Sequence, residues 1–441
     1  MESAVTEIGI QKYEVYKSSE VEWLGEIPGH WLLLPGSRIT NERCEKNKGM
    51  VEKTVLSLSY GKVVIKPEEK LVGLVPESFE TYQLVYPGDI IIRPTDLQND
   101  KTSLRVGLAK DKGIITSAYI NMKVNAGYLG RYYHYFLYAL DITKMIYSLG
   151  SGLRQNLSYE DFKRLKFLAP PLEEQTAIAN FLDRKTAQID QAIAQKERLI
   201  ELLQERRQIL IQRAVTRGLN PDVPMKDSGV EWIGEIPAHW RSVKMKYLTE
   251  FIYDGTHGSY PRSDEGFRLL SVRNIVDNKF VFREDDSLVA ARHFKEISSK
   301  FLVREDDIQL AIVGATLGKA AVVESVDEPF VTQRSIATIR VEKKSVLPVF
   351  LLNYIRSESF QKYLWLNAGF SAQPGVYLGT IQDSTVPMPP IQEQFEITTY
   401  IGIISDSINA AISCKKREIG KLREYKSTLI NAAVTGKIKV C

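Results

Sequence analysis

The chain has 441 residues, 44% of them apolar and 25% charged, which is enough apolar side chain for two or three folded domains. Its net charge of +4 is too small to indicate a nucleic-acid partner by itself, so any such contacts must be local or shared with another subunit. No apolar run reaches the roughly 18 residues of a membrane span, and no signal peptide is evident. The three scattered cysteines, Cys44, Cys414 and Cys441, predict neither a disulfide framework nor a zinc site, and this cysteine usage fits the reducing cytoplasm.

The first recognisable element is the phrase VEWLGEIPGHW at 21–31, which recurs as VEWIGEIPAHW at 230–240 with two substitutions. A recognition surface would be expected to differ between two copies, whereas a structural element would not. The tryptophans of the phrase are therefore predicted to be core anchors, and its histidines are predicted to pack with them. These residues are Trp23, His30, Trp31, Trp232, His239 and Trp240.

A variable region follows each copy of the phrase. Region one holds the runs TVLSLSY, KVVIK, YPGDIIIRP and GIITSAYINMKV, then the helically spaced YLGRYYHYFLYAL. Region two holds GFRLLSVRNI, VREDDIQLAIVG, KAAVVES and VTQRSIATIRV, then the helical VFLLNYIRSESFQKYLWL. β-Branched and aromatic runs separated by Gly, Pro and Asp predict strands joined by turns, so each region is predicted to be α+β. PGDIIIRP and EDDIQLAIVG occupy corresponding places.

A long helix is predicted after each region, beginning behind a pair of prolines. Eight apolar positions form a coiled-coil-like stripe in the first helix, and all eight recur 219 residues later: Ile178, Leu182, Ile189, Ile193, Ile200, Leu203, Leu210 and Ala214, then Ile397, Ile401, Ile408, Ile412, Ile419, Leu422, Leu429 and Ala433. Each helix of roughly 43 residues would be about 65 Å long and needs a partner. We expect the two to pack antiparallel, ending at Gly218 and Gly436.

The chain is thus predicted to be a circular, pseudo-two-fold repeat in which the C-terminus ends where the N-terminus could begin. Its expected segments are an N-terminal segment (1–20), a first domain (21–171), a first long helix (172–216), a linker (217–229), a second domain (230–390), a second long helix (391–435) and a tail (436–441).

No catalytic constellation is recognisable. GATLGKA at 314–320 is one residue short of a nucleotide-binding phosphate loop and lacks its hydroxyl residue, and the five histidines show no metal-ligand spacing. We therefore expect no catalytic residue, metal or cofactor.

The order of WLGEIPGHW, a variable β-rich region, APPLEEQ and a long helix, present twice, resembles the specificity (S) subunit of type I restriction–modification enzymes. The resemblance covers nearly the whole chain, and residues 254–275 and 87–97 are similar to recurrent stretches of its target-recognition domains. It departs in two places: Gln392 stands where the first copy has Glu173, and region one lacks a counterpart of DGTHGSYP.

The resemblance implies two target-recognition domains that each read one half of a bipartite, asymmetric double-stranded DNA site, separated by an antiparallel helix pair that fixes the spacer. It also implies two methyltransferase (M) subunits, which carry the adenosylmethionine site, and restriction (R) subunits that translocate and cleave. The chain itself would be non-catalytic, with no small-molecule substrate.

Base readout needs side chains such as Arg, Lys, Asn, Gln, Ser or Thr at groove depth, although phosphate contacts are commoner and a solvated surface role is an alternative for each residue. The charged faces of the long helices, such as QERRQ at 204–208, are expected to be solvated or to bind M subunits. The DNA-binding candidates are Tyr60, Lys62, Arg93, Thr95, Asn99, Lys101, Arg154, Gln155 and Asn156 in region one, and Thr256, His257, Tyr260, Arg273, Asn274, Thr316, Lys319, Gln333, Arg334, Gln373 and Tyr377 in region two.

Two alternatives stay open from the sequence. One is a coiled-coil scaffold whose β-rich domains bind proteins. The other is a specificity subunit of a methylation-only or phage-defence system that has no nuclease.

Overall fold

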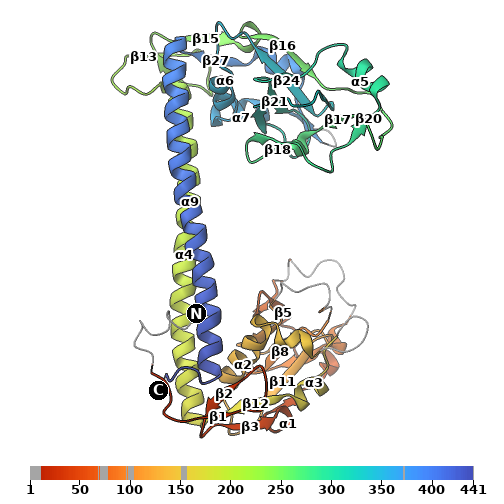
Figure 1. The fold of residues 1–441 in the computed structure, drawn as a ribbon, viewed down its shortest axis with the longest axis vertical. Helices are drawn as coiled ribbons and strands as arrows, with labels where there is room; N and C mark the ends of the chain where they lie inside the picture. Colours follow the sequence, from red (N-terminus) through yellow and green to blue (C-terminus); the bar gives the residue numbers. More distant parts are fainter. Residues whose placement is uncertain are drawn as a thin grey trace. The chain divides into compact units, whose positions relative to one another are not determined.

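The computed structural model describes residues 11–67, 69, 78–95, 97, 104–149, 156–370 and 373–440. It divides into two compact units, of which unit 1 comprises Met1–Lys196 with Lys416–Cys441 and unit 2 comprises Glu197–Lys415. The boundary residues Lys196 and Lys415 are 219 positions apart, which is the offset between the repeated helices. Each unit therefore contains one variable region and one end of each long helix (Figure 1).

The two long helices are α4 (Leu172–Arg217) and α9 (Ile391–Val434), which agree with the predicted ranges to within a residue. The apolar stripe is buried or half-buried along both helices, and Ile178, Leu182 and Ile397 are completely buried. Gly218 and Gly436 follow the helices with φ of +72°, the left-handed conformation in which glycine commonly ends a helix.

Within each unit the long helices pair antiparallel, as predicted. In unit 1, Lys196 Nζ lies 2.5 Å from Glu418 Oε2, and Lys426 Nζ lies 2.7 Å from Asp190 Oδ1. In unit 2, Arg207 donates a 2.9 Å hydrogen bond to Asn409. From one pair to the next, residue numbers rise along α4 as they fall along α9, so the two helices run in opposite directions.

Both units are built on a four-stranded antiparallel sheet with the same connectivity, β4-β11-β8-β9 in unit 1 and β16-β24-β21-β22 in unit 2. The third strands, β8 and β21, come from PGDIIIRP and EDDIQLAIVG, so these two runs do correspond. The strands of unit 1 are β4 (Thr40–Glu42), β11 (Ile120–Val124), β8 (Ile90–Ile92) and β9 (Val106–Leu108), and those of unit 2 are β16 (Thr249–Asp254), β24 (Ile336–Val341), β21 (Ile308–Ala311) and β22 (Ala320–Val322).

The remaining elements of unit 1 surround this sheet. Strands pair as β1–β2, β3–β12, β5–β6 and β7–β10, and α2 packs against β9 and β11. Their bounds are β1 (Tyr16–Ser18), β2 (Glu26–Pro28), β3 (Leu32–Pro35), α1 (Gly36–Ile39), β5 (Leu56–Ser59), β6 (Lys62–Ile65), β7 (Gln83–Val85), β10 (Gly113–Ile115), α2 (Gly130–Ile142), α3 (Tyr159–Arg164) and β12 (Lys166–Ala169).

Unit 2 repeats this plan with additions. Its predicted helix at 349–366 is two helices, because Ser357 between them has an extended backbone with φ of −71° and ψ of 154°. The bounds are β13 (Met225–Asp227), β14 (Glu235–Pro237), β15 (Arg241–Lys244), β17 (Phe267–Leu270), β18 (Ile275–Val276), β19 (Lys279–Phe280), β20 (Leu288–Val289), α5 (Ala291–Ser298), β23 (Val331–Thr332), α6 (Pro348–Ile355), α7 (Glu358–Leu366), β25 (Gly369–Phe370), β26 (Pro374–Gly375), α8 (Leu378–Asp383) and β27 (Thr385–Met388).

The repeated phrase binds the ends of both long helices in its unit, an arrangement we call the clasp. In unit 1, buried Trp31 donates its indole N–H to Glu174 in the first turn of α4 at 3.0 Å. A Cβ at Gly436, just beyond α9, would lie 2.4 Å from Pro28 and 3.1 Å from Trp31. The phrase recurs because each unit has one helix start and one helix end to join.

Unit 2 forms the same clasp. Trp240 is completely buried and donates to Glu393 of α9 at 3.0 Å, while a Cβ at Gly218 beyond α4 would lie 3.2 Å from Trp240. Trp31 and Trp240 are therefore core anchors, as predicted, whereas Trp23 and Trp232 are half-buried. The histidines are not simply packed: His30 and His239 stay about half exposed and bond Glu174 and Glu393, because their ring nitrogens reach the helix carboxylates.

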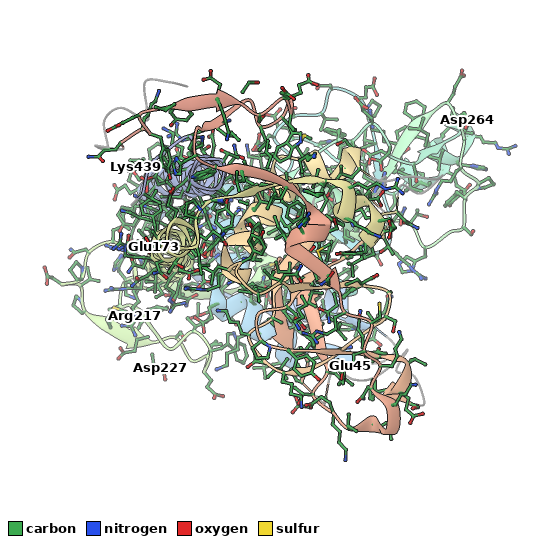
Figure 2. All side chains as sticks on the ribbon, turned by 90° about the horizontal axis from the view of Figure 1, so that it is seen from below. Glu45, Glu173, Arg217, Asp227, Asp264 and Lys439 are labelled. Carbon is green, nitrogen blue, oxygen red and sulfur yellow. The ribbon has the colours of Figure 1, made fainter. Side chains whose placement is uncertain are left out.

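The first and last described segments of the chain meet in unit 1, which confirms the predicted circular arrangement. The Lys439 N–H donates to the Gln11 carbonyl at 2.7 Å, and the Tyr16 hydroxyl donates to the Gly436 carbonyl at 3.1 Å. Figure 2 shows Lys439 beside the helices near Glu173 at the start of α4. Among the described residues, no helix has the length and apolar character needed to cross a membrane.

Candidate nucleic-acid interface

Four loops of unit 2 are joined into one surface by backbone hydrogen bonds. Arg334 N donates to Thr256 O at 3.0 Å, Ile312 N to Ser335 O at 2.9 Å, and Gly314 N to Pro374 O at 2.8 Å. We call loops 254–260, 312–319, 333–335 and 373–377 the unit 2 loop surface. It unites all the region-two candidates except Arg273 and Asn274, although they come from distant parts of the chain.

The candidates on the unit 2 loop surface differ in accessibility. The exposed members can meet a ligand more readily than the half-buried ones, and Tyr377 has 83% of its surface accessible. Thr256, Tyr260, Thr316 and Gln333 are half-buried, while His257, Lys319, Arg334, Gln373 and Tyr377 are exposed.

A hollow of about 260 Å³ opens beside loop 254–260. Two carboxylates on its wall are each held by one neighbour: Asp254 bonds His257, and Glu296 accepts from the Tyr260 hydroxyl at 3.1 Å. The hydroxyl of Thr332, which is buried, has no hydrogen-bond partner among the described residues. The hollow thus offers acceptors that suit a donor such as a base amino group.

Arg273 and Asn274 lie apart from this arrangement. Asn274 is completely buried, its amide donating to Val281 O and Asp286 Oδ1, each at 2.9 Å. The Arg273 guanidinium binds Asp285 and Asp286. In this structure Asn274 therefore holds its own turn together and offers no atom to a base, while Arg273 is committed to two aspartates.

In unit 1 the described candidates also converge. Leu157 N donates to Pro94 O at 2.9 Å and Arg93 N to Arg105 O at 2.9 Å, which joins the loops after β8 and before α3. A Cβ at Gly61 would lie 3.1 Å from Leu104, so the β5–β6 hairpin adjoins them. This unit 1 loop surface carries Tyr60, Lys62, Thr95 and Asn156, all exposed, and half-buried Arg93.

Buried Arg105 organises the unit 1 loop surface and was not among the predicted residues. Its side chain is completely buried and donates to Thr95 O at 2.6 Å, to Arg93 O at 3.4 Å and to the Tyr147 hydroxyl at 3.2 Å. Its own N–H is bound by Asp141, whose carboxyl pKa is raised by burial. A lone arginine in TSLRVGL gives no sign in the sequence that it faces inward.

Four candidates, Asn99, Lys101, Arg154 and Gln155, lie outside the described residues. Within the described ranges, no group of three or more His, Cys, Asp or Glu side chains could hold a metal ion.

The long helices of unit 2 expose apolar side chains. Leu202 and Ile209 of α4 are 44% and 51% accessible, and Phe395 and Ile403 of α9 are 60% and 64% accessible.

Comparison with known proteins adds to these observations. The family model described as the type I restriction modification DNA specificity domain matches residues 44–202 and 273–419. The chain is 24% identical over 336 residues to the type I restriction enzyme MjaVIII specificity subunit of Methanocaldococcus jannaschii, covering 75% of each chain. It is also 24% identical to the putative MjaX specificity subunit of that organism, over 97% of this chain and 98% of the relative.

Two solved structures share the fold. One chain comes from work on complex assembly and conformational transition of the type I R-M system; it has a TM-score of 0.68 and 14% identity, with 92% of this chain and 98% of that chain covered. The HsdS subunit from Thermoanaerobacter tengcongensis has a TM-score of 0.53 and 15% identity, with 93% and 98% covered.

Proposed function

The chain belongs to the type I restriction modification DNA specificity family, and from this membership we propose that it selects the DNA sequence on which a type I restriction–modification complex acts. In this role it is a non-catalytic subunit. Unit 1 and unit 2 each read one half of a bipartite, asymmetric site in double-stranded DNA.

The observation that carries this proposal is the pair of loop surfaces. Each lies on a sheet of the same connectivity, yet the two surfaces present different side chains: Tyr60, Lys62 and Asn156 in unit 1, and His257, Arg334 and Tyr377 in unit 2. A scaffold shared by the two units, with polar loops that differ between them, suits two readers of unlike sequences, because base edges are discriminated by the donors and acceptors that loops present.

The helix pair supplies the second part of the proposal. Because α4 and α9 pair antiparallel within both units, their length sets the separation of the two readers and hence the unread spacer. The apolar side chains that the helices expose in unit 2, such as Ile209 and Ile403, support docking of methyltransferase subunits there. We infer two such M subunits, with R subunits added in the restricting complex.

The decisive experiment is methylome sequencing of a host that expresses this chain with its M subunit, beside a host that expresses the M subunit alone. The expected result is a new bipartite motif with methyladenine in both halves, present only with this chain. Unchanged methylation, with an M subunit shown to be active, would contradict the proposal and favour a protein-binding scaffold.

A further inference from the structure

The tip of the β5–β6 hairpin in unit 1 has an unusual residue in an unusual conformation. Ser59 pairs with Lys62, so the turn consists of Tyr60 and Gly61 alone, with φ of +48° and +75°. A two-residue turn with both central residues at positive φ strongly prefers Asn-Gly or Asp-Gly. A bulky aromatic residue is a true outlier at the first position.

The Tyr60 ring also stands free of the fold. It is 90% accessible, more than any other large apolar side chain among the described residues. Burial in the core therefore gives no reason for the aromatic ring, and the turn itself disfavours it. Strained residues of this kind persist only where the surrounding structure holds them, and they cluster at functional sites.

The hairpin below the tip is firmly held. Leu56 and Val63 belong to a buried cluster with Val85, and the hairpin approaches β9 so closely that a Cβ at Gly107 would lie 2.5 Å from Leu58. The tip is therefore a projecting ring on a rigid support, and it adjoins the loops that carry Arg93 and Thr95.

We propose that Tyr60 is a stacking wedge, which inserts its ring against an unstacked nucleobase in the half-site that unit 1 contacts. Lys62, exposed on the same hairpin, meets the adjacent phosphate. A rigid tip with an exposed ring has the form of the side chains that other proteins insert between base steps. This inference rests on the proposed function and adds a mode of contact to it.

The test uses the complete complex with its M subunits and a duplex that carries the motif found by methylome sequencing. Tyr60→Asn is the informative variant, because asparagine suits the turn and removes the ring without endangering the hairpin. Tyr60→Phe keeps the ring, and Tyr247→Ala removes an exposed tyrosine, 70% accessible, outside both loop surfaces.

Affinity is measured by fluorescence anisotropy, and unstacking by 2-aminopurine placed in turn along each half-site. We expect Tyr60→Asn to weaken binding by about fivefold or more, as loss of one base–aromatic stack requires, and to abolish a 2-aminopurine signal confined to one half-site. Tyr60→Phe and Tyr247→Ala should behave as the wild type.

Two results would overturn the inference while leaving the proposed function intact. One is bipartite binding by Tyr60→Asn with unchanged affinity and 2-aminopurine signal. The other is impaired assembly of Tyr60→Asn with M subunits in the absence of DNA, which would make the tip a protein contact. A complex that binds no bipartite site at all would overturn the proposed function and this inference together.

Discussion

Replacing Glu174 by alanine should loosen the clasp of unit 1 specifically. Glu174 accepts hydrogen bonds from the Trp31 indole at 3.0 Å and the Tyr13 hydroxyl at 2.8 Å, and it binds His30. Burial opposes ionisation of this carboxyl, but the hydrogen bonds from His30, Trp31 and Tyr13 outweigh it and lower the Glu174 pKa. The carboxylate is thus the shared acceptor that joins the phrase to α4.

The size of the effect follows from what each donor loses. Trp31 is completely buried, so an unpaired indole N–H costs about 1–3 kcal/mol. Tyr13 adds about 1 kcal/mol. His30 adds little, since its side chain is 49% exposed and such pairs contribute about 0–1 kcal/mol. We expect Glu174→Ala to reduce the free energy of local opening by about 2–5 kcal/mol.

The pH dependence has a definite sign. Because the folded pKa of Glu174 lies below the ordinary value of 4.5, the unfolded state binds more protons as the pH falls through this window. The stabilisation is therefore complete above pH 4.5 and is lost as the pH falls through the folded pKa. The difference between Glu174→Ala and the wild type should consequently become smaller in acid.

Hydrogen exchange measured by mass spectrometry on peptides covering 26–35 and 172–182 reports this opening. Glu173→Ala removes an exposed carboxylate from the same helix turn and controls for the helix dipole. Glu393→Ala should loosen the clasp of unit 2 by a smaller amount, because Glu393 bonds Trp240 and His239 but no tyrosine, and it should leave these unit 1 peptides unchanged. Equal protection in Glu174→Ala and Glu173→Ala would refute the reasoning.

Four further outcomes are expected. Burial lowers the His134 pKa from 6.5 to about 4, so the free energy of unfolding falls as the pH drops from 6.5 towards 4. His134→Phe should remove about 2 kcal/mol of this loss between pH 8 and pH 5, measured by urea unfolding. An unchanged pH dependence in the variant would contradict this expectation. Arg105→Gln should relax discrimination between bases at one half-site, measured in binding assays. The control is Arg340→Gln, which lies at the far end of β24 from the unit 2 loop surface and should leave base discrimination at both half-sites unchanged. Exchange of residues 32–168 for the equivalent region of a relative should change one half of the methylated motif, and a change in both halves would count against separate readers. Removal of seven residues from each long helix should alter the spacer length and neither half-site, as methylome sequencing would show.

The amino-acid sequence determined the repeat, the two long helices and the equivalent order of strands. These features are encoded locally: the stripe from Ile178 to Ala214 repeats every three, four or seven residues, and paired prolines and Gly218 mark where the helix begins and ends. The antiparallel pairing followed because each stripe lacked any other partner of equal length. The same offset of 219 residues at all eight positions of the stripe made the helix repeat unambiguous.

The tertiary structure alone decided which side chains face a ligand and which hold the fold. His30 bonds a carboxylate 144 residues away, Asn274 turns inward, and Arg105 supports the loop that carries Thr95. Neighbouring residues do not reveal such roles, because a polar side chain in a loop has the same local pattern whether its partner is water or a distant backbone carbonyl. Only folding brings those partners within hydrogen-bonding distance. The sequence could therefore predict which residues belong to the loop surfaces, but not how their side chains are arranged there.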